Sequence, residues 1–166
     1  MELKIVEMPI SELVPYEGNA KLHPHFQIDM IADSIADFGD CDPIGAWHDQ
    51  DGNAVIVEGH GRYMALKKLG IETAPVIFLD HLDDEGRRAY GLAHNQLTMN
   101  SGFDSEVLQS EIDDLLPEID MERYGFDTSE PLDLSQFDTD ILNKSDKASK
   151  EQREIVCECC GVTILV

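Results

Sequence analysis

The stretch from Val55 to Gly70 constrains the fold more than any other part of the chain, because it predicts a strand, a tight turn and a helix in immediate succession. Three β-branched residues at 55–57 indicate a buried strand. Gly59 and Gly61 allow a sharp turn and a close approach of the backbone to a ligand. Helical spacing follows, and Gly70 stands where the C-cap of that helix belongs.

The start of this predicted helix has the features of an anion-binding site. Backbone N–H groups at a helix start are unpaired within the helix and carry partial positive charge. Arg62 lies at this entrance, and Lys67 and Lys68 follow one turn later. No other Lys or Arg occurs between Lys21 and Arg87, in a chain of net charge −22. The cluster favours a phosphate site, although the pattern is neither a P-loop nor a dinucleotide fingerprint and the two lysines could simply form a solvated helix face.

Length and composition limit what the rest of the chain can be. With 166 residues, 42% of them apolar, the chain holds one domain with a packed core. No apolar run approaches the roughly 20 residues that a membrane helix requires. The amino terminus lacks a signal-peptide pattern, so we expect a cytoplasmic protein with no membrane association. Because affinity for duplex DNA depends on neutralising phosphates, the net charge predicts no tight DNA binding by this domain alone.

Strand and helix patterns are interleaved in the first two thirds of the chain, which predicts an α+β domain over residues 1–116. Expected strands cover 3–8, 44–47, 54–57 and 73–79, and the second and third form a hairpin. Expected helices cover 28–38, 63–69, 83–96 and 105–116, and residues 13–24 have the composition of an irregular loop. Residues 117–154 are acidic, polar and poor in large apolar side chains, so we expect a linker or tail there.

The last segment, 155–166, raises a separate question. Cys157-x-x-Cys160-Gly resembles one knuckle of a zinc ribbon, which predicts a partial zinc site with Cys157 and Cys160 as ligands. Structural zinc takes four ligands, usually from two such knuckles, and only one knuckle is present. Reactive thiols or half of a shared site are the alternative.

Three motifs occur in order along the domain: Ile10-x-x-Leu-x-Pro-x-x-x-Asn19, Gly39-x-x-x-Pro-Ile44 and Val57-x-Gly-x-x-Arg-x-x-Ala-x-x-x-Leu-Gly70. This order resembles the ParB/sulfiredoxin-like domain, the ParB N-terminal or ParB-like nuclease family. The helix ending at Leu92–Leu97 is similar to that of phage-type members, which are often associated with DNA methyltransferases. The resemblance covers residues 3–126 and implies a small mixed sheet with packed helices.

The resemblance also implies a ligand and the residues that hold it. In nucleotide-binding members the glycine-arginine box holds a triphosphate, so Gly59, His60, Gly61 and Arg62 would contact the phosphates of a nucleoside triphosphate. Asn95, from the later helix, would be a ligand of the phosphate or of Mg²⁺. The guanidinium fork of arginine suits phosphate oxygens, and Mg²⁺ takes few protein ligands beside substrate phosphates.

The chain departs from the family at two histidines. Nucleotide-hydrolysing members usually carry Glu where His60 and His94 stand, and histidine is a poorer partner for Mg²⁺. Sulfiredoxin has its catalytic Cys at the position of His60, so we expect no sulfinic-acid reductase activity. His60 would be a phosphate donor or general acid with a pKa near neutrality, or else a turn residue.

Three further positions keep alternatives. Glu58 would be a catalytic base or a solvent-facing residue. Asn95 would be a ligand or a plain helix-ending residue. His23 and His25, on either side of a proline, are expected to be an exposed loop pair, and metal ligation is the alternative.

The family resemblance implies a nucleotide-binding domain that acts as an accessory factor in phage or mobile-element DNA metabolism or modification. A DNA methyltransferase or another DNA-acting protein would be its partner. Nucleoside triphosphatase or phosphotransferase activity stays open. The alternatives are a non-catalytic acidic adaptor or DNA mimic, which the negative charge would suit, and a small-molecule phosphotransferase of the same fold.

Overall fold

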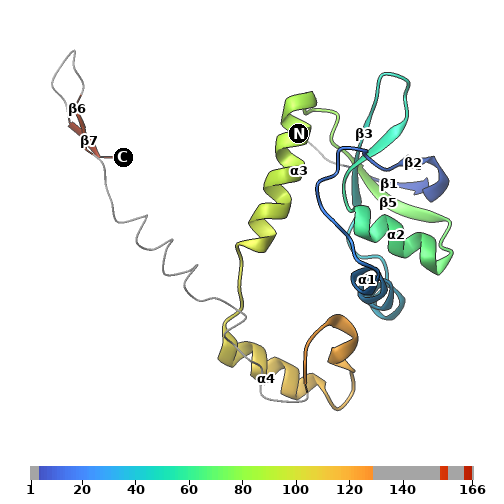
Figure 1. Ribbon diagram of the computed structural model, residues 1–166, viewed down its shortest axis with the longest axis vertical. Coiled ribbons are helices and arrows are strands. Elements are labelled where there is room, and N and C mark those ends of the chain that lie inside the picture. Colours follow the sequence, from blue (N-terminus) through green and yellow to red (C-terminus); the bar gives the residue numbers. More distant parts are fainter. Residues whose placement is uncertain (1–3, 129–153, 157–162, 166) are drawn as a thin grey trace.

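The computed structural model describes residues 4–128, 154–156 and 163–165. The predicted α+β class is confirmed: a five-stranded mixed sheet packs with helices (Figure 1). The elements up to the second helix are β1 (Ile5–Pro9), η1 (Ile10–Glu12), β2 (Leu13–Val14), α1 (His25–Phe38), β3 (Ile44–His48), β4 (Ala54–Glu58) and α2 (His60–Leu69). They are followed by β5 (Thr73–Phe78), α3 (Asp84–Met99), α4 (Ser105–Leu115), η2 (Met121–Tyr124), β6 (Glu154–Val156) and β7 (Thr163–Leu165).

The sheet has the order β1-β5-β3-β4-β2 and places the glycine turn at the end of an inner strand. The predicted hairpin is confirmed, since β3 and β4 pair antiparallel with Trp47 opposite Val55. A bulge interrupts this pairing between Gly45 and Ala46. β3 also pairs parallel with β5, so the chain from β4 through α2 crosses over to reach a parallel neighbour of β3.

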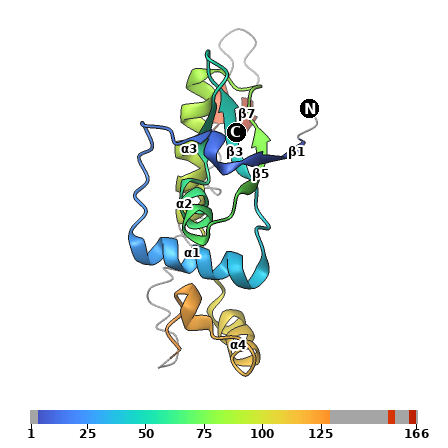
Figure 2. The same cartoon turned by 90° about the vertical axis from the view of Figure 1, so that its right-hand side faces the viewer.

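The core lies between the sheet and the helix pair α1 and α2 (Figure 2). The largest fully buried side chains are Ile44, Ile56, Leu66 and Val76. They come from β3, β4, α2 and β5, so the strand–turn–helix unit contributes two of the four. The predicted glycine caps are present, because α1 ends at Gly39 and α2 ends at Gly70 in the left-handed conformation.

Residues 13–24 are less irregular than expected. Leu13 and Val14 form the short strand β2, which pairs parallel with β4. Leu13 is buried in the core, and this burial outweighs the local turn composition that favoured a loop. The rest of the segment runs as a loop to α1.

The helices after β5 begin at the predicted caps. The side chain of Asp83 accepts a hydrogen bond from the Gly86 N–H, and that of Asp104 accepts from the N–H groups of Glu106 and Val107. In Figure 1, α3 runs beside the sheet and leads to α4.

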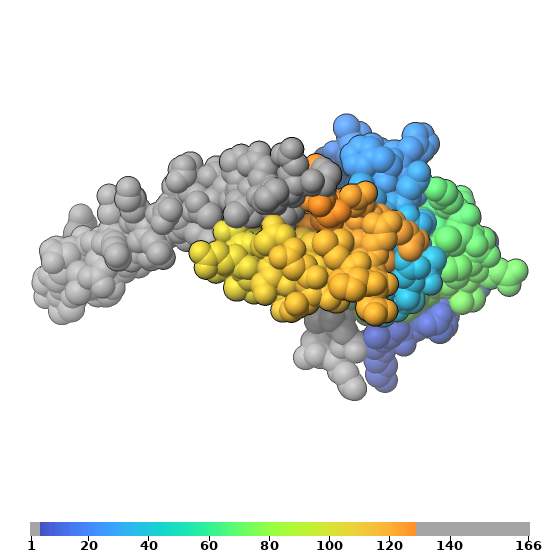
Figure 3. Space-filling view, turned by 90° about the horizontal axis from the view of Figure 1, so that it is seen from below, coloured from blue at the N-terminus to red at the C-terminus, as the bar shows by residue number. Residues whose placement is uncertain are grey.

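The chain returns to α1 after α4, and Figure 3 shows this segment lying against the helix. Arg123 of η2 forms ion pairs with Asp33 and Asp37 of α1, and the Tyr124 ring lies 5.3 Å from that of Phe38. The domain limit at residue 116 and the tail stay predictions, although residues 121–124 of the expected linker contact α1. Cys157 and Cys160, with the predicted zinc knuckle, lie outside the described residues.

Among the described residues, no helix has the length and apolar character needed to cross a membrane.

Candidate functional site

The glycine turn between β4 and α2 forms the centre of the candidate site. Gly59 is the N-cap of α2 and has a φ of 91°, in the left-handed region that favours glycine. A Cβ on Gly59 would also lie 3.3 Å from Ile44 Cγ1. The first N–H groups of α2 follow this turn directly, and they have no partner within the helix.

Gly61 allows the loop before α1 to approach the start of α2. A Cβ at this position would lie 2.9 Å from His23 Nδ1 and 3.0 Å from Ile31 Cδ1. His23 Nδ1 itself lies 3.1 Å from the side-chain oxygen of Gln27. The second glycine of the motif is thus explained by close packing of His23, which places this histidine at the site rather than in an exposed loop.

His60 is a buried, neutral residue that holds the loop in place. Its Nε2 accepts a hydrogen bond from the Tyr16 N–H at 3.2 Å, and the residue is only 5% exposed. Burial, reinforced by the nearby His23, lowers the pKa of His60 to about 4. The expected pKa near neutrality is therefore wrong, because the sequence did not show how deeply the ring is enclosed.

Arg62 reaches back to the segment between α1 and β3. Its Nε lies 2.9 Å from Asp40 Oδ1, and its Nη1 donates to Asp42 Oδ2 at 2.8 Å. The two carboxylates differ in environment, since the Asp40 side chain is 14% exposed and that of Asp42 is 72% exposed. Burial raises the pKa of Asp40, and Arg62 opposes this rise.

Glu58 connects β4 to α3. Its Oε2 lies 3.1 Å from His94 Nδ1, and its side chain is 13% exposed. Gly45 makes room for it, because a Cβ there would lie 2.6 Å from Glu58 Cγ. Burial raises the pKa of the Tyr90 hydroxyl, and the charge of Glu58 and a hydrogen bond to it add to the rise. Glu58 therefore faces α3 rather than bulk solvent.

A cavity of about 220 Å³ is lined by the six residues that the family resemblance assigned to a catalytic or nucleotide-binding role: Glu58, Gly59, His60, Gly61, Arg62 and Asn95. The roles assigned to them stay predictions. The Asn95 Nδ2 donates to the Gly91 carbonyl, so its amide oxygen is the acceptor it can offer to the cavity.

Sequence reasoning missed three charged or titratable residues that line the same cavity: Lys21, His23 and Asp42. The first two come shortly after the Asn of the first motif, and Asp42 comes directly before the Pro of the second. All three motifs therefore meet at one cavity, and their loops, rather than their regular elements, supply the missed side chains.

A second cavity of about 60 Å³ adjoins the first and shares Asn19, Val57 and Asn95 with it. Its floor includes Trp47 and its wall is the inner face of α3. The Arg87 guanidinium lies 3.6 Å from the centre of the Trp47 ring.

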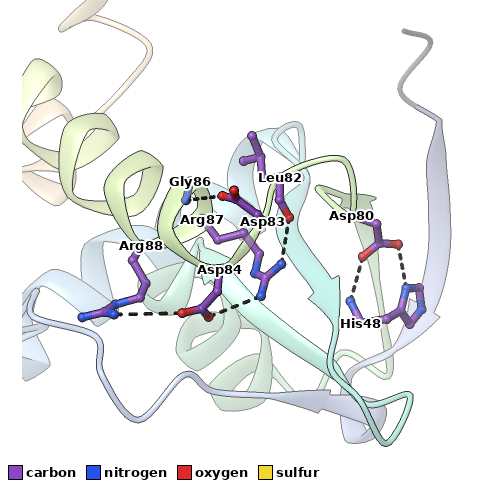
Figure 4. Close-up of polar contacts among 8 residues, drawn as sticks. All are labelled: His48, Asp80, Leu82, Asp83, Asp84, Gly86, Arg87 and Arg88. Carbon is purple, nitrogen blue, oxygen red and sulfur yellow. Dashed lines mark hydrogen bonds and ion pairs between the residues drawn. The ribbon is translucent and has the colours of Figure 1, made fainter.

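Figure 4 shows that the two arginines of this wall, Arg87 and Arg88, both turn toward Asp84. Arg87 also donates to the Leu82 carbonyl. Two guanidinium groups face one carboxylate, so these three side chains carry a net charge of +1 and the second cavity offers a weakly cationic surface beside the first.

The basic cluster predicted from spacing is not gathered at the cavity. Lys68 forms an ion pair with Asp29 of α1, and Lys67 Nζ lies 3.4 Å from the Tyr63 hydroxyl. Both lysines occupy the last turn of α2, where cations interact favourably with the helix dipole. Arg62 and Lys21 are the cationic side chains that line the larger cavity.

No metal centre is formed by side chains of the described part of the chain. Within it, no group of three or more His, Cys, Asp or Glu side chains is placed to hold a metal ion. Any Mg²⁺ at the larger cavity would therefore need most of its ligands from a bound phosphate and from water.

No family model matches the chain. The ParB-like nuclease domain-containing protein YnaK of Escherichia coli (strain K12) is 40% identical over 87 residues, which are 52% of this chain and 95% of that protein. The chain therefore belongs to the ParB-like nuclease domain family.

Solved structures agree with this assignment at the level of the fold. The C-terminally truncated chromosome-partitioning protein ParB from Caulobacter crescentus, complexed with CTP-gamma-S, has a TM-score of 0.59 and 22% identity, covering 72% of this chain and 68% of that one. Sulfiredoxin from Arabidopsis thaliana has a TM-score of 0.42 and 26% identity. The match covers 46% of this chain and 85% of that one. The domain has the mixed α+β fold of ParB.

Proposed function

We propose that the domain binds a nucleotide, with the phosphates in the larger cavity against residues 59–62. The observation that carries this proposal is the start of α2. The N–H groups of the first turn follow the left-handed Gly59 and have no partner within the helix, and Arg62 lies beside them in a cavity of about 220 Å³. Helix N-termini are anion sites, and an arginine fork matches phosphate oxygens. The CTP analogue in the solved ParB complex supports a nucleotide as the ligand class.

Within this proposal His60 positions other groups and does not supply charge. Because Nε2 accepts from Tyr16, the proton of the neutral ring is on Nδ1. The ring would fix the loop over the phosphates and would not carry positive charge at neutral pH. Glu58 is the candidate base, and its Oε2 lies 3.1 Å from His94 Nδ1.

Magnesium enters the proposal only together with the phosphates. The described residues form no complete set of ligands, whereas the amide oxygen of Asn95 is a hard donor of the kind that Mg²⁺ accepts. A nucleotide-bound Mg²⁺ would therefore depend on phosphate oxygens more than on protein.

The test is calorimetric titration with CTP and ATP, with and without Mg²⁺, on wild type and on Arg62→Ala. Loss of charge-assisted hydrogen bonds should weaken binding roughly 10- to 100-fold. Lys68→Ala is the matched control, because it removes one positive charge from the same helix outside the cavity and should change affinity less than about twofold. Circular dichroism checks that each variant is folded. The proposal fails when wild type binds neither nucleotide, or when folded Arg62→Ala binds as tightly as wild type.

The second cavity favours a second candidate function, phosphoryl transfer to a small acceptor. It adjoins the proposed phosphate site along Asn19 and Asn95, so it would give a small hydroxyl compound a place beside the phosphates. Phosphorus NMR of the protein with ATP and a set of small hydroxyl compounds would reveal a new phosphate ester. Release of inorganic phosphate alone would indicate hydrolysis instead.

We further propose, from the family resemblance, that the protein is an accessory factor in phage or mobile-element DNA metabolism, with a DNA methyltransferase as a candidate partner. The net charge of −22 means that contact with DNA would come through such a partner. A gel-shift assay with random duplex DNA at physiological salt should show no tight complex. Salt-sensitive binding by the isolated protein would contradict this expectation.

A further inference from the structure

The arginine of the proposed phosphate site forms ion pairs with two carboxylates. Asp40 lies on its Nε and Asp42 on its Nη1, at 2.9 and 2.8 Å. Arginine has a limited number of donors in a fixed fork, so a phosphate that approaches Arg62 meets a fork that is partly occupied. It also meets the negative charge of the carboxylates.

We propose that Asp42 competes with the ligand for Arg62, so that phosphate binding requires displacement of the Asp42 carboxylate. This inference rests on the proposed function, because it concerns the affinity of the same site. Asp42 would then be a specificity-determining residue that lowers the affinity of the site for anions in general. Only ligands that make enough further contacts with the protein would displace its carboxylate and bind.

The two aspartates have different roles at Arg62 because their surroundings differ. Both carboxylate oxygens of Asp40 are buried, and Arg62 Nε lies 2.9 Å from one of them, so the position of this carboxylate depends on Arg62. Asp40 therefore orients the arginine and stays with it. Asp42 lines the cavity and its side chain is 72% exposed, so it can rotate into water, where its charge is solvated, when a phosphate arrives.

The competition should depend on charge. A carboxylate and a phosphate oxygen on neighbouring donors of one guanidinium repel each other, and the repulsion grows with the charge of the ligand. Removing the Asp42 charge should therefore tighten the binding of CTP more than that of CMP. Screening by salt should reduce the difference, because Asp42 lies at the surface.

The experiment compares Asp42→Asn with Asp51→Asn by calorimetric titration with inorganic tripolyphosphate, CTP and CMP. Asp51 lies exposed in the turn between β3 and β4, so its substitution removes the same charge away from the cavity. Asp42→Asn should bind tripolyphosphate and CTP about 3- to 30-fold more tightly than wild type. Asp51→Asn should stay within about twofold. A gain that shrinks in 0.5 M salt supports the electrostatic cause.

The outcomes separate this inference from the proposed function. Wild type that binds CTP, with Asp42→Asn unchanged or weaker, overturns the inference and leaves the function standing. Equal gains in both variants also overturn it, since they indicate a general effect of net charge. Binding by Asp42→Asn alone supports it. Absence of binding by every form, with all variants folded, overturns the proposed function and the inference with it.

Discussion

Helices α2 and α3 border the same cavity but differ in how they are held. α2 has ten residues, and five of them are buried: His60, Gly61, Tyr63, Ala65 and Leu66. α3 has sixteen residues, and none of them is buried. Both ends of α2 are capped by left-handed glycines, whereas α3 is capped by the side chain of Asp83 and ends without a left-handed residue.

The difference shows which wall of the site is fixed by the fold. α2 is held by apolar packing, so the glycine turn and its N–H groups keep their geometry as long as the domain is folded. α3 is joined to the sheet by polar and ring contacts, chiefly Glu58 with His94 and Arg87 with Trp47. Elements with few buried contacts open at lower free energy than core elements do. We therefore expect the glycine turn at the start of α2 to be rigid and the position of α3 to vary.

The largest effect should come from the apolar contacts that distinguish the two helices. Leu66→Ala removes a fully buried side chain of α2 and should lower the free energy of unfolding by about 2–5 kcal/mol. Leu92→Ala makes the same change on α3, where the side chain is 62% exposed, and should cost less than about 0.5 kcal/mol. Urea unfolding followed by circular dichroism measures both. Similar losses of unfolding free energy at Leu66 and Leu92 would show that α2 and α3 are held equally by apolar packing.

The buried histidine at the start of α2 should make stability depend on pH. The pKa of His60 is about 4 in the folded protein and near 6.5 in an unfolded chain, so the unfolded state binds more protons between these values. Stability from this group is complete above about pH 6.5 and is lost as the pH falls toward 4, with about 2 kcal/mol lost by pH 5.

Wild type and His60→Gln, compared at pH 7.5 and pH 5, isolate this contribution from that of the carboxylates. The loss of unfolding free energy between pH 7.5 and pH 5 should be about 2 kcal/mol smaller in His60→Gln than in wild type. His81, exposed in the turn after β5 and outside both cavities, provides the control: His81→Gln should keep the pH dependence of wild type. An identical pH dependence in wild type and His60→Gln would show that burial of His60 does not perturb its titration.

A matched pair of glycine substitutions should give the smallest effects, with opposite signs. Gly59→Ala forces a side chain into a left-handed conformation against Ile44, which should cost about 1–2 kcal/mol. Gly91→Ala, inside α3, places its Cβ at an ordinary 3.4 Å from the Val57 carbonyl and should stabilise the helix by about 0.5–1 kcal/mol. Thermal unfolding distinguishes the two. Destabilisation by Gly91→Ala would mean that α3 packs more tightly against β4 than the contacts indicate.

Much of the fold could be predicted, because its strongest signals are local. Gly39 and Gly70 mark helix ends by their backbone conformation, and Asp83 and Asp104 mark helix starts by their short acceptor side chains. The strand β2 could not be predicted, since it exists through the burial of Leu13 against residues far along the chain.

The candidate site likewise contains residues that could be predicted from the sequence and residues that could not. The glycine-arginine box and Asn95 could be recognised from the motifs and do line one cavity. The pairing of Arg62 with Asp40 and Asp42 could not, because it joins the first turn of α2 to a loop about twenty positions earlier that has no regular period. Likewise, spacing places Lys67 and Lys68 near Arg62, but helix geometry turns them toward α1 and Tyr63.

The stacking of Arg87 on Trp47 has a spectroscopic consequence. Trp47 is the single tryptophan of the chain, so the indole emission comes from one site at the join of β3 and α3. A guanidinium at 3.6 Å from the ring centre shapes the field that the excited indole experiences, and the emission maximum will shift when the helix moves away. Native fluorescence thus reports, without any label, whether α3 is seated on the sheet.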